Sequence, residues 1–302
     1  MSTALYLLAA AIILYGLYRL AISWGSWGIL RSYRRPPRRV KSEFGYDSPE
    51  DFNLACESLK VPVAPDIILD GWLFRTNKPR RGVLVHLHGI WDSRRPRLPL
   101  AARMVLHGFD CVFYDSRGNG ESGGRYCTYG QEEKHDFIKV LDHIQNLGID
   151  TSRVAIVGHS MGAATAVYAA EIESRIKALV LEACYRDLPT AIRDFARVFV
   201  FFAPEFIIRK ATERAGRIGQ FDPESLSPLK VMPRLRHPTL FVQGTADRRI
   251  KTRYAEELFA AKPEPKELYF ITGARHGRLP FQGGLAYPAK LEAWLCAQMP
   301  VI

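Results

Sequence analysis

The sequence is poor in the residues that build disulfide frameworks and metal sites. Its five cysteines are an odd number, lie far apart and never occur with C-x-x-C spacing. We therefore expect neither a disulfide framework nor a zinc site, and a reducing compartment fits this cysteine usage best. We also expect no other metal and no cofactor. The cysteines are Cys56, Cys111, Cys127, Cys184 and Cys296.

Acidic residues are missing from the first 41 positions, which contain seven basic ones. The net charge of the whole chain is +11, so the remainder carries only about +4. Because the basic charge is concentrated in one segment, it does not indicate a nucleic-acid-binding domain, and we expect no nucleic-acid partner. The length of 302 residues with 47% hydrophobic content allows a large core, which we assign to one domain over residues 46–302.

Charge is almost absent from the first 30 residues, where Arg19 is the single charged side chain. Residues 4–18 are an unbroken apolar or aromatic run. A membrane-spanning helix needs about 20 residues, which the run supplies if it continues past Arg19 and that guanidinium reaches the interface. The sequence therefore predicts a transmembrane anchor over residues 1–30. The alternative is a cleaved signal peptide, but its positive leading segment is missing from Met1-Ser-Thr3.

Basic residues follow the apolar run directly and favour a cytoplasmic location for what comes after them. We expect a single-pass membrane protein whose catalytic domain lies on the cytoplasmic side, joined to the anchor by a basic linker over residues 31–45. The linker either adsorbs to anionic lipid head groups or serves only as a solvated flank. Its basic residues are Arg31, Arg34, Arg35, Arg38, Arg39 and Lys41.

The strongest chemical pattern is the pentapeptide Gly158-His-Ser-Met-Gly162, which stands between a short apolar run and a helix of small residues. A G-x-S-x-G sequence between strand and helix is typical of a nucleophile elbow, although the pentapeptide alone could be a serine in a Gly-rich turn. The elbow predicts Ser160 as a nucleophile. Since the helix N-terminus favours negative charge, the backbone N–H of Met161 is predicted to stabilise an oxyanion.

Strand-like and helix-like segments alternate through the rest of the chain, which predicts a mostly parallel sheet with flanking helices. Asp70-Gly71 is a turn signal that we expect to interrupt the second strand. The expected strands are 53–61, 67–74, 82–87, 110–114, 154–157, 176–182, 238–243 and 266–272, and the expected helices include 98–107 and 131–147.

The alternation stops between residues 186 and 236, where two apolar helical runs are rich in phenylalanine. We predict a helical lid over Ser160 here, with Phe199, Phe202 and Phe206 as substrate-binding residues for an acyl chain. The alternative is ordinary packing of helices in the core.

A general base and an orienting acid are needed to activate a serine hydroxyl. Asp247 and His276 each follow a predicted strand, so the carboxyl ends of a parallel sheet would bring them toward Ser160. Asp187 is the runner-up acid. The second oxyanion donor is predicted to be the backbone N–H of Ile90, just after the strand ending at residue 87, while His88 braces that loop.

Taken together, these motifs resemble the α/β-hydrolase superfamily, and within it the branch of serine aminopeptidase-like hydrolases, monoacylglycerol lipases and lysophospholipases. The resemblance implies an α/β-hydrolase fold, a Ser160–Asp247–His276 triad and a structural role for the Gly-rich loop. The chain departs from esterases with an HGGG oxyanion loop, because Ile90 stands there. The motifs are His88-Gly89, Asp115-Ser-Arg-Gly-Asn-Gly-Glu-Ser122, Gly158-His-Ser-Met-Gly162, Gly244-Thr-Ala-Asp247 and Arg275-His-Gly277.

We therefore expect a membrane-anchored serine hydrolase that cleaves ester or thioester bonds of a lipid or acylated substrate. Two alternatives remain: a serine peptidase or amidase that uses the same triad, and a non-catalytic interaction protein anchored to a membrane. An intact set of catalytic residues argues against the second.

Overall fold

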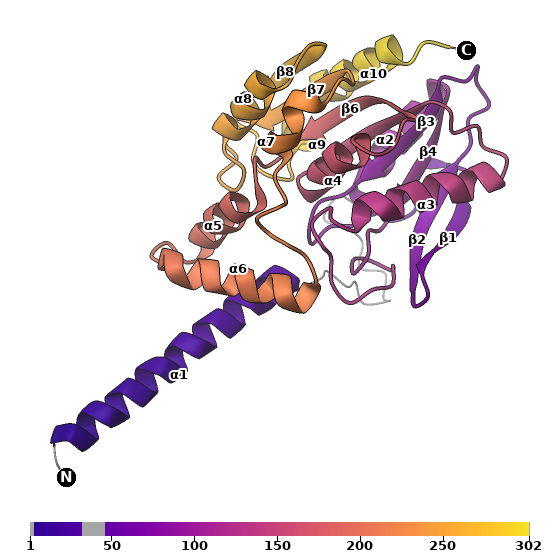
Figure 1. Ribbon diagram of the computed structural model, residues 1–302. Coiled ribbons are helices and arrows are strands. Elements are labelled where there is room, and N and C mark those ends of the chain that lie inside the picture. The colour runs from indigo at the N-terminus through magenta and orange to yellow at the C-terminus, as the bar shows by residue number, and fades with distance from the viewer. Residues whose placement is uncertain (1–2, 32–45, 302) are drawn as a thin grey trace.

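A twisted sheet of eight strands forms the centre of the molecule in a computed structural model that describes residues 3–31 and 46–301 (Figure 1). The strand order is β1-β2-β4-β3-β5-β6-β7-β8. Strands β3 to β8 pair in parallel, whereas β2 runs antiparallel to both of its neighbours. The strands are β1 (Glu57–Ala64), β2 (Ile67–Phe74), β3 (Gly82–Leu87), β4 (Phe109–Tyr114), β5 (Val154–His159), β6 (Ile176–Glu182), β7 (Thr239–Gly244) and β8 (Lys266–Ile271).

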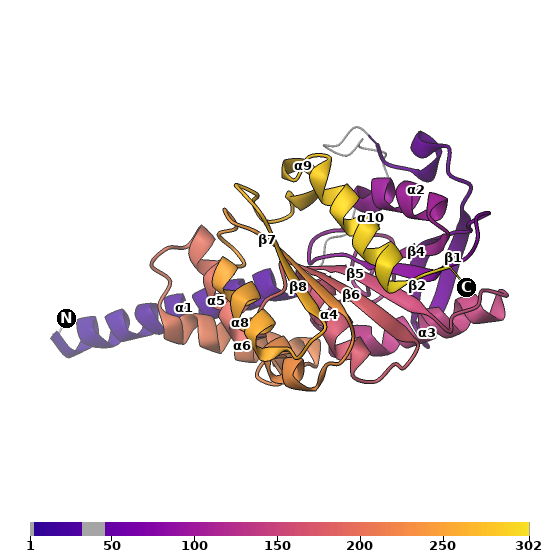
Figure 2. The ribbon, with the colours of Figure 1, turned by 90° about the horizontal axis from the view of Figure 1, so that it is seen from above.

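Helices cover both faces of this sheet, so the molecule has three layers (Figure 2). The apolar side chains of α3, α4 and α8 join the core on one face, and those of α2 and α10 join the core on the other. Every residue of β3 and β5 is buried, which explains why these strands read as continuous apolar runs. The helices are α2 (Leu98–Leu106), α3 (Glu133–Asn146), α4 (Met161–Ala170), α7 (Pro228–Val231), α8 (Thr252–Ala261), α9 (Leu279–Gln282) and α10 (Ala286–Gln298), with 3-10 turns at Pro49–Phe52, Arg95–Arg97 and Met232–Arg234.

The predicted α/β-hydrolase fold with a mostly parallel sheet is confirmed, but two details at its antiparallel edge were wrong. The first strand begins at Glu57 instead of residue 53. Asp70 and Gly71 lie inside an uninterrupted β2, and the chain turns just before Ile67 instead. Gly71 is needed for close packing and not for a turn, because a Cβ there would lie 2.8 Å from the Cβ of Tyr114 on β4.

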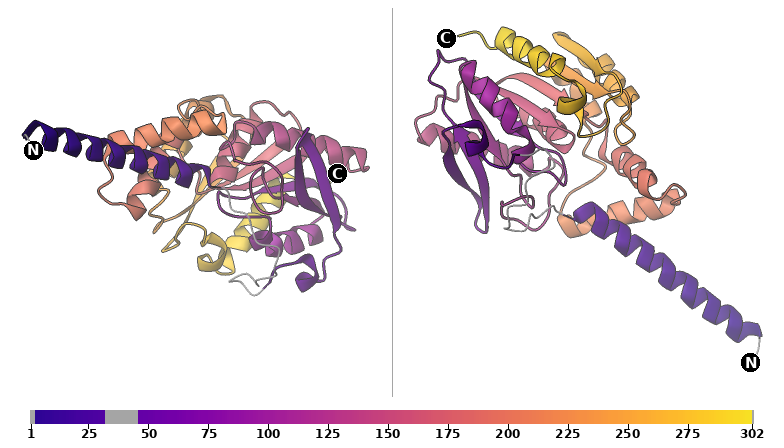
Figure 3. Two further views of the ribbon diagram at one scale, coloured as in Figure 1. Left: turned by 90° about the horizontal axis from the view of Figure 1, so that it is seen from below. Right: turned by 180° about the vertical axis from the view of Figure 1, so that it is seen from behind.

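Two longer helices, α5 (Leu188–Phe199) and α6 (Glu205–Gly219), fill the predicted lid region between β6 and β7. Helix α1 (Thr3–Leu30) projects away from the sheet, and its C-terminal part lies beside α6 (Figure 3). It is the one helix of the described residues that is long and apolar enough to cross a membrane. The predicted basic linker lies outside the described residues, except for Arg31.

Candidate active site

Ser160 occupies a sharp turn between β5 and α4 and has the positive backbone angle φ of 52°. Two glycines permit this turn. A Cβ on Gly158 would lie 2.5 Å from the carbonyl oxygen of Gly162, and one on Gly162 would lie 2.1 Å from that of Leu87. A serine rarely adopts a positive φ, and such strain is typical of a nucleophile elbow. The elbow geometry expected from the sequence is therefore present.

Both predicted oxyanion donors belong to segments that border Ser160. Met161 opens α4, where the first N–H groups of a helix have no intrahelical acceptor. Ile90 is half-buried in the loop that follows β3. This loop approaches the nucleophile closely, since a Cβ on Gly89 would lie 3.4 Å from the Cβ of Ser160. The backbone N–H groups of Met161 and Ile90 therefore stay the predicted oxyanion donors.

His88 holds the loop after β3 in place, in agreement with the bracing role expected for it. Its ring is fully buried, and its Nε2 accepts a hydrogen bond of 2.8 Å from the backbone N–H of Ser116. The ring proton therefore belongs on Nδ1, which lies 2.7 Å from the carbonyl oxygen of Gly89. In this arrangement His88 links the ends of β3 and β4.

Asp247 and His276 form a hydrogen-bonded pair, with His276 Nδ1 donating to Asp247 Oδ2 at 2.7 Å. The other carboxylate oxygen accepts the backbone N–H groups of Arg249 at 2.8 Å and Ile250 at 2.9 Å. This arrangement orients the imidazole and fixes its tautomer. The runner-up acid, Asp187, instead caps α5 by accepting the N–H of Thr190 at 2.8 Å.

Burial and pairing shift the pKa values of both residues. Burial favours the neutral form of Asp247, but its hydrogen bond to His276 and the two backbone N–H groups outweigh this and lower its pKa. Burial lowers the pKa of His276, and Asp247 opposes that shift only in part. The pair is therefore a carboxylate beside a neutral imidazole at pH 7, which is the state in which a histidine can act as a general base.

Beneath His276 lies a buried cluster that sequence reasoning missed. Glu182 ends β6 and pairs with Arg97 through both carboxylate oxygens, and the hydroxyl of Tyr287 donates to it. His159, the residue before the nucleophile, lies 3.4 Å from Glu182 and places its ring 5.1 Å from that of His276. A charged residue at the end of a buried strand was the available signal, but nothing in the sequence identified its partners.

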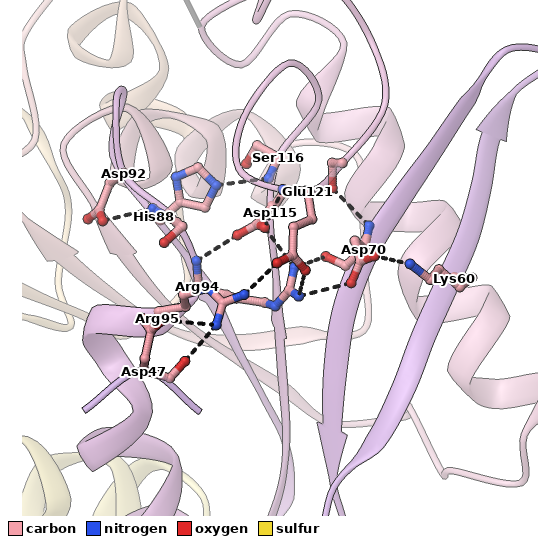
Figure 4. A network of polar contacts seen from close by, with 12 residues as sticks. Asp47, Lys60, Asp70, His88, Asp92, Arg94, Arg95, Asp115, Ser116 and Glu121 are labelled. Carbon is pink, nitrogen blue, oxygen red and sulfur yellow. Dashed lines mark hydrogen bonds and ion pairs between the residues drawn. The ribbon is translucent and has the colours of Figure 1, made fainter. Parts of the chain in front are cut away.

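The Gly-rich loop after β4 is structural, as the resemblance implied. Its Arg117 forms a two-pronged ion pair with Asp136, at 2.7 Å and 2.6 Å. The buried Arg94 binds Asp115 at 2.6 Å and Asp70 at 2.9 Å, and thereby ties this loop to β2 and to the loop after β3 (Figure 4). These contacts fix the backbone around the site without reaching the reacting atoms.

The three predicted substrate-binding phenylalanines lie toward the outer surface. Phe199 is 61% exposed, Phe202 84% and Phe206 54%. Phe195 of α5, in contrast, packs edge-on against Trp91 in the loop after β3, with 5.2 Å between ring centroids. A role in substrate binding stays a prediction for the three. Within 3–31 and 46–301, no cluster of three or more potential ligands could hold a metal ion.

Comparisons with known proteins agree with the fold. The sequence model of the serine aminopeptidase S33 family matches residues 78–226. The chain is 29% identical to the uncharacterized protein YqkD of Bacillus subtilis over 242 residues, which are 78% of each protein. It is 26% identical to the α/β-hydrolase domain-containing protein WAV2 of Arabidopsis thaliana over 218 residues, covering 70% of this chain and 68% of WAV2.

Among solved structures, the esterase Pf2001 of Pyrococcus furiosus superposes with a TM-score of 0.69 at 21% identity, covering 89% of this chain and 99% of the esterase. At this identity the likeness shows the fold. The sheet order, the strained serine between β5 and α4, and the similarity to these proteins lead to one conclusion. The chain belongs to the α/β-hydrolase superfamily.

Proposed function

We propose that this protein is a membrane-anchored serine hydrolase that cleaves carboxylic ester or thioester bonds of lipid or acylated substrates. The observation that carries the proposal is the Asp247–His276 hydrogen bond, formed beside a serine held in a strained elbow. The mechanism also requires a hydrogen bond from Ser160 Oγ to His276 Nε2 in the substrate complex. Such catalytic contacts often tighten only when substrate is bound.

In the proposed mechanism, Ser160 Oγ attacks the carbonyl carbon of the substrate while its proton moves to His276 Nε2. The carbonyl oxygen becomes an oxyanion that accepts the backbone N–H groups of Ile90 and Met161. Collapse of the intermediate breaks the bond to the alcohol or thiol, which leaves with the proton from His276. Water then attacks the acyl-enzyme by the same steps, with His276 as the base, which releases the acid and restores Ser160. Asp247 stabilises the imidazolium in both halves of the reaction.

The apolar α1 and the helices between β6 and β7 support a lipid substrate. Phe195 of α5 contacts Trp91 beside the oxyanion loop, and the guanidinium of Arg249, two residues after the catalytic acid, lies 5.0 Å from the Phe195 ring centroid. Helix α5 thus bridges two loops of the site, as a lid would. A substrate dissolved in the bilayer to which α1 anchors the enzyme would reach this region without entering water.

A fluorophosphonate probe tests the serine mechanism in the detergent-solubilised protein. We expect labelling of the wild type, none with Ser160→Ala or His276→Ala, and weaker labelling with Asp247→Asn. Asp187→Asn is the matched control: asparagine caps a helix as well as aspartate does, so labelling should persist. Equal labelling of wild type and Ser160→Ala would refute the proposal.

Acyl-chain preference tests the substrate class. Nitrophenyl esters from acetate to palmitate are compared on the same preparation, and we expect higher kcat/KM for the long chains. Equal or better use of acetate contradicts a lipid substrate.

The match to a serine aminopeptidase family favours an amidase as the second candidate. Such an enzyme needs an acidic group to bind the substrate amine. Two acidic residues of the proposed lid are already paired, Glu205 with Arg197 at 2.8 Å and Glu213 with Lys210 at 2.8 Å. We therefore place esters first, and hydrolysis of amino-acid anilides faster than of matched esters would reverse that order.

A further inference from the structure

Helix α6 accompanies α1 along the last part of α1, and the two helices run in the same direction. Near its start, α6 stacks Phe206 on Tyr18 with 6.2 Å between ring centroids. Further along, the buried hydroxyl of Ser26 donates to the carbonyl oxygen of Ala211 at 3.1 Å. By contrast, every α1 side chain from Tyr6 to Leu17 is exposed. Within the described side chains of α1, burial against the domain therefore begins only at Tyr18, on one side of the helix.

The described residues of α1 that no other element accompanies are too few to cross a bilayer by themselves. Residues 3–17 rise about 22 Å at about 1.5 Å per residue, whereas the hydrocarbon core is about 30 Å thick and needs about 20 residues. A span that begins at Thr3 must continue to about Ile22. In such a span Tyr18 lies about 6 Å inside the hydrocarbon boundary that is reached at Ile22, and the start of α6 lies beside Tyr18.

The surface that reaches this depth is apolar. Phe199 ends α5, Phe201 and Phe202 form the turn between α5 and α6, and Phe206 lies in the first turn of α6. Phe201 and Phe202 are 86% and 84% exposed, and the other two more than half exposed. Burying one such side chain is worth roughly 1.5–3 kcal/mol, so a water-facing position for all four is unfavourable. We call these four residues the phenylalanine tip.

Charged residues follow at the level expected for lipid head groups. Arg209 and Lys210 lie on α6 one turn after the tip. Near the end of α1, a cavity of about 680 Å³ is lined by several basic residues and by Trp27. Glu205 and Arg197 at the tip itself pair with each other at 2.8 Å and so partly neutralise one another. The basic residues lining the cavity are Arg31, Arg125 and Arg214.

We propose that the phenylalanine tip inserts into the membrane leaflet that α1 leaves as it enters the catalytic domain, forming a second membrane contact. The proposal rests on the membrane anchor of the proposed function. An insertion of about 6 Å falls within the depth of about 5–10 Å known for apolar faces of interfacial helices. It also holds α5, and with it the loop of Ile90, at the lipid surface.

Depth-dependent quenching tests the inference in the full-length protein reconstituted into phosphatidylcholine–phosphatidylglycerol vesicles. In a background with Cys56→Ser and Cys296→Ser, a single cysteine for an environment-sensitive dye replaces Leu14, Phe202 or Leu106. Leu14 lies in the middle of the expected span. Leu106 is 66% exposed at the end of α2, on the opposite edge of the sheet from Ser160, and is the matched control. Lipids carry a nitroxide at a shallow or a deep acyl position.

We expect the Phe202 dye to lose most of its fluorescence to the shallow nitroxide, the Leu14 dye to the deep one, and the Leu106 dye to neither. Quenching at Leu14 without quenching at Phe202 overturns the inference and leaves the anchor intact. No quenching at either position overturns both the anchor and the inference. Equal quenching at Leu106 and Phe202 overturns the inference as well, because the dye would then report its own affinity for lipid.

Discussion

The buried pair of Glu182 and Arg97 provides the sharpest test of the energetics of this site. Glu182 is fully buried and Arg97 is 8% exposed, with 3.0 Å between Oε1 and Nη1 and a second, closer contact between the other two atoms. Glu182→Gln keeps the shape of the side chain but removes its charge. The guanidinium of Arg97 would then be left buried without a counter-ion, next to the elbow that holds Ser160.

The loss of stability caused by Glu182→Gln follows from the pKa of Glu182 and from the general cost of breaking a buried ion pair. Burial opposes ionisation of Glu182, but Arg97 and His159 overcome it and lower its pKa from 4.5 to about 2. At about 1.4 kcal/mol per pKa unit, this shift corresponds to about 3 kcal/mol of stability at pH 7. Removing one member of a buried ion pair costs about 3–5 kcal/mol. We therefore expect Glu182→Gln to lower the Tm by about 6–15 °C.

The Tm is measured by thermal unfolding, monitored by circular dichroism in one detergent, for the wild type, Glu182→Gln, Arg97→Met and the double variant. The double variant should recover much of the loss, since it leaves no unpaired charge. Because the folded pKa of Glu182 is depressed, the stabilisation is present above about pH 4.5 and is lost as the pH falls toward about 2. A Tm change below about 2 °C for Glu182→Gln at pH 7 would refute the reasoning.

Three further predictions concern the site and its support. Asp247→Asn should lower kcat for ester hydrolysis about 10³–10⁴-fold with little change in Tm, because it disturbs the tautomer of His276 and not the core. A loss of kcat below about tenfold contradicts the proposed role of Asp247. Burial lowers the pKa of His276, so the acid limb of the kcat/KM profile should lie below pH 6.5. Activity falls as the pH drops through that pKa, because the base becomes protonated. An acid limb above pH 7 would exclude His276 as the base. Arg94→Met should lower the free energy of unfolding, measured in urea, by about 3–5 kcal/mol, because Asp70 and Asp115 lose their shared partner. A change under about 1 kcal/mol would mean that water solvates the two carboxylates in place of Arg94.

Local pattern alone determined the elements that position the proposed catalytic residues. Residues 82–87 and 176–182 were predicted as strands with the bounds that the structure has. β3 is buried throughout and β6 everywhere except at Lys177, so a largely apolar run of the right length marks both strands. The elbow was equally readable, because two glycines and a serine at fixed spacing meet a steric requirement within five residues. The order of Ser160, Asp247 and His276 then followed from strand ends.

Contacts between distant residues were decided by the tertiary structure. Asp70-Gly71 is a sequence typical of a turn, yet β2 continues through it. Gly71 allows β4 to approach closely, and the carboxylate of Asp70 forms an ion pair with Arg94. The partner of Glu182 is 85 positions away in the sequence. Likewise, the apolar spacing of α1 and α6 predicted two helices but not their parallel packing, nor the outward direction of Phe202. Periodicity reports which face of an element avoids water, whereas only the folded chain decides what covers that face and which charges meet.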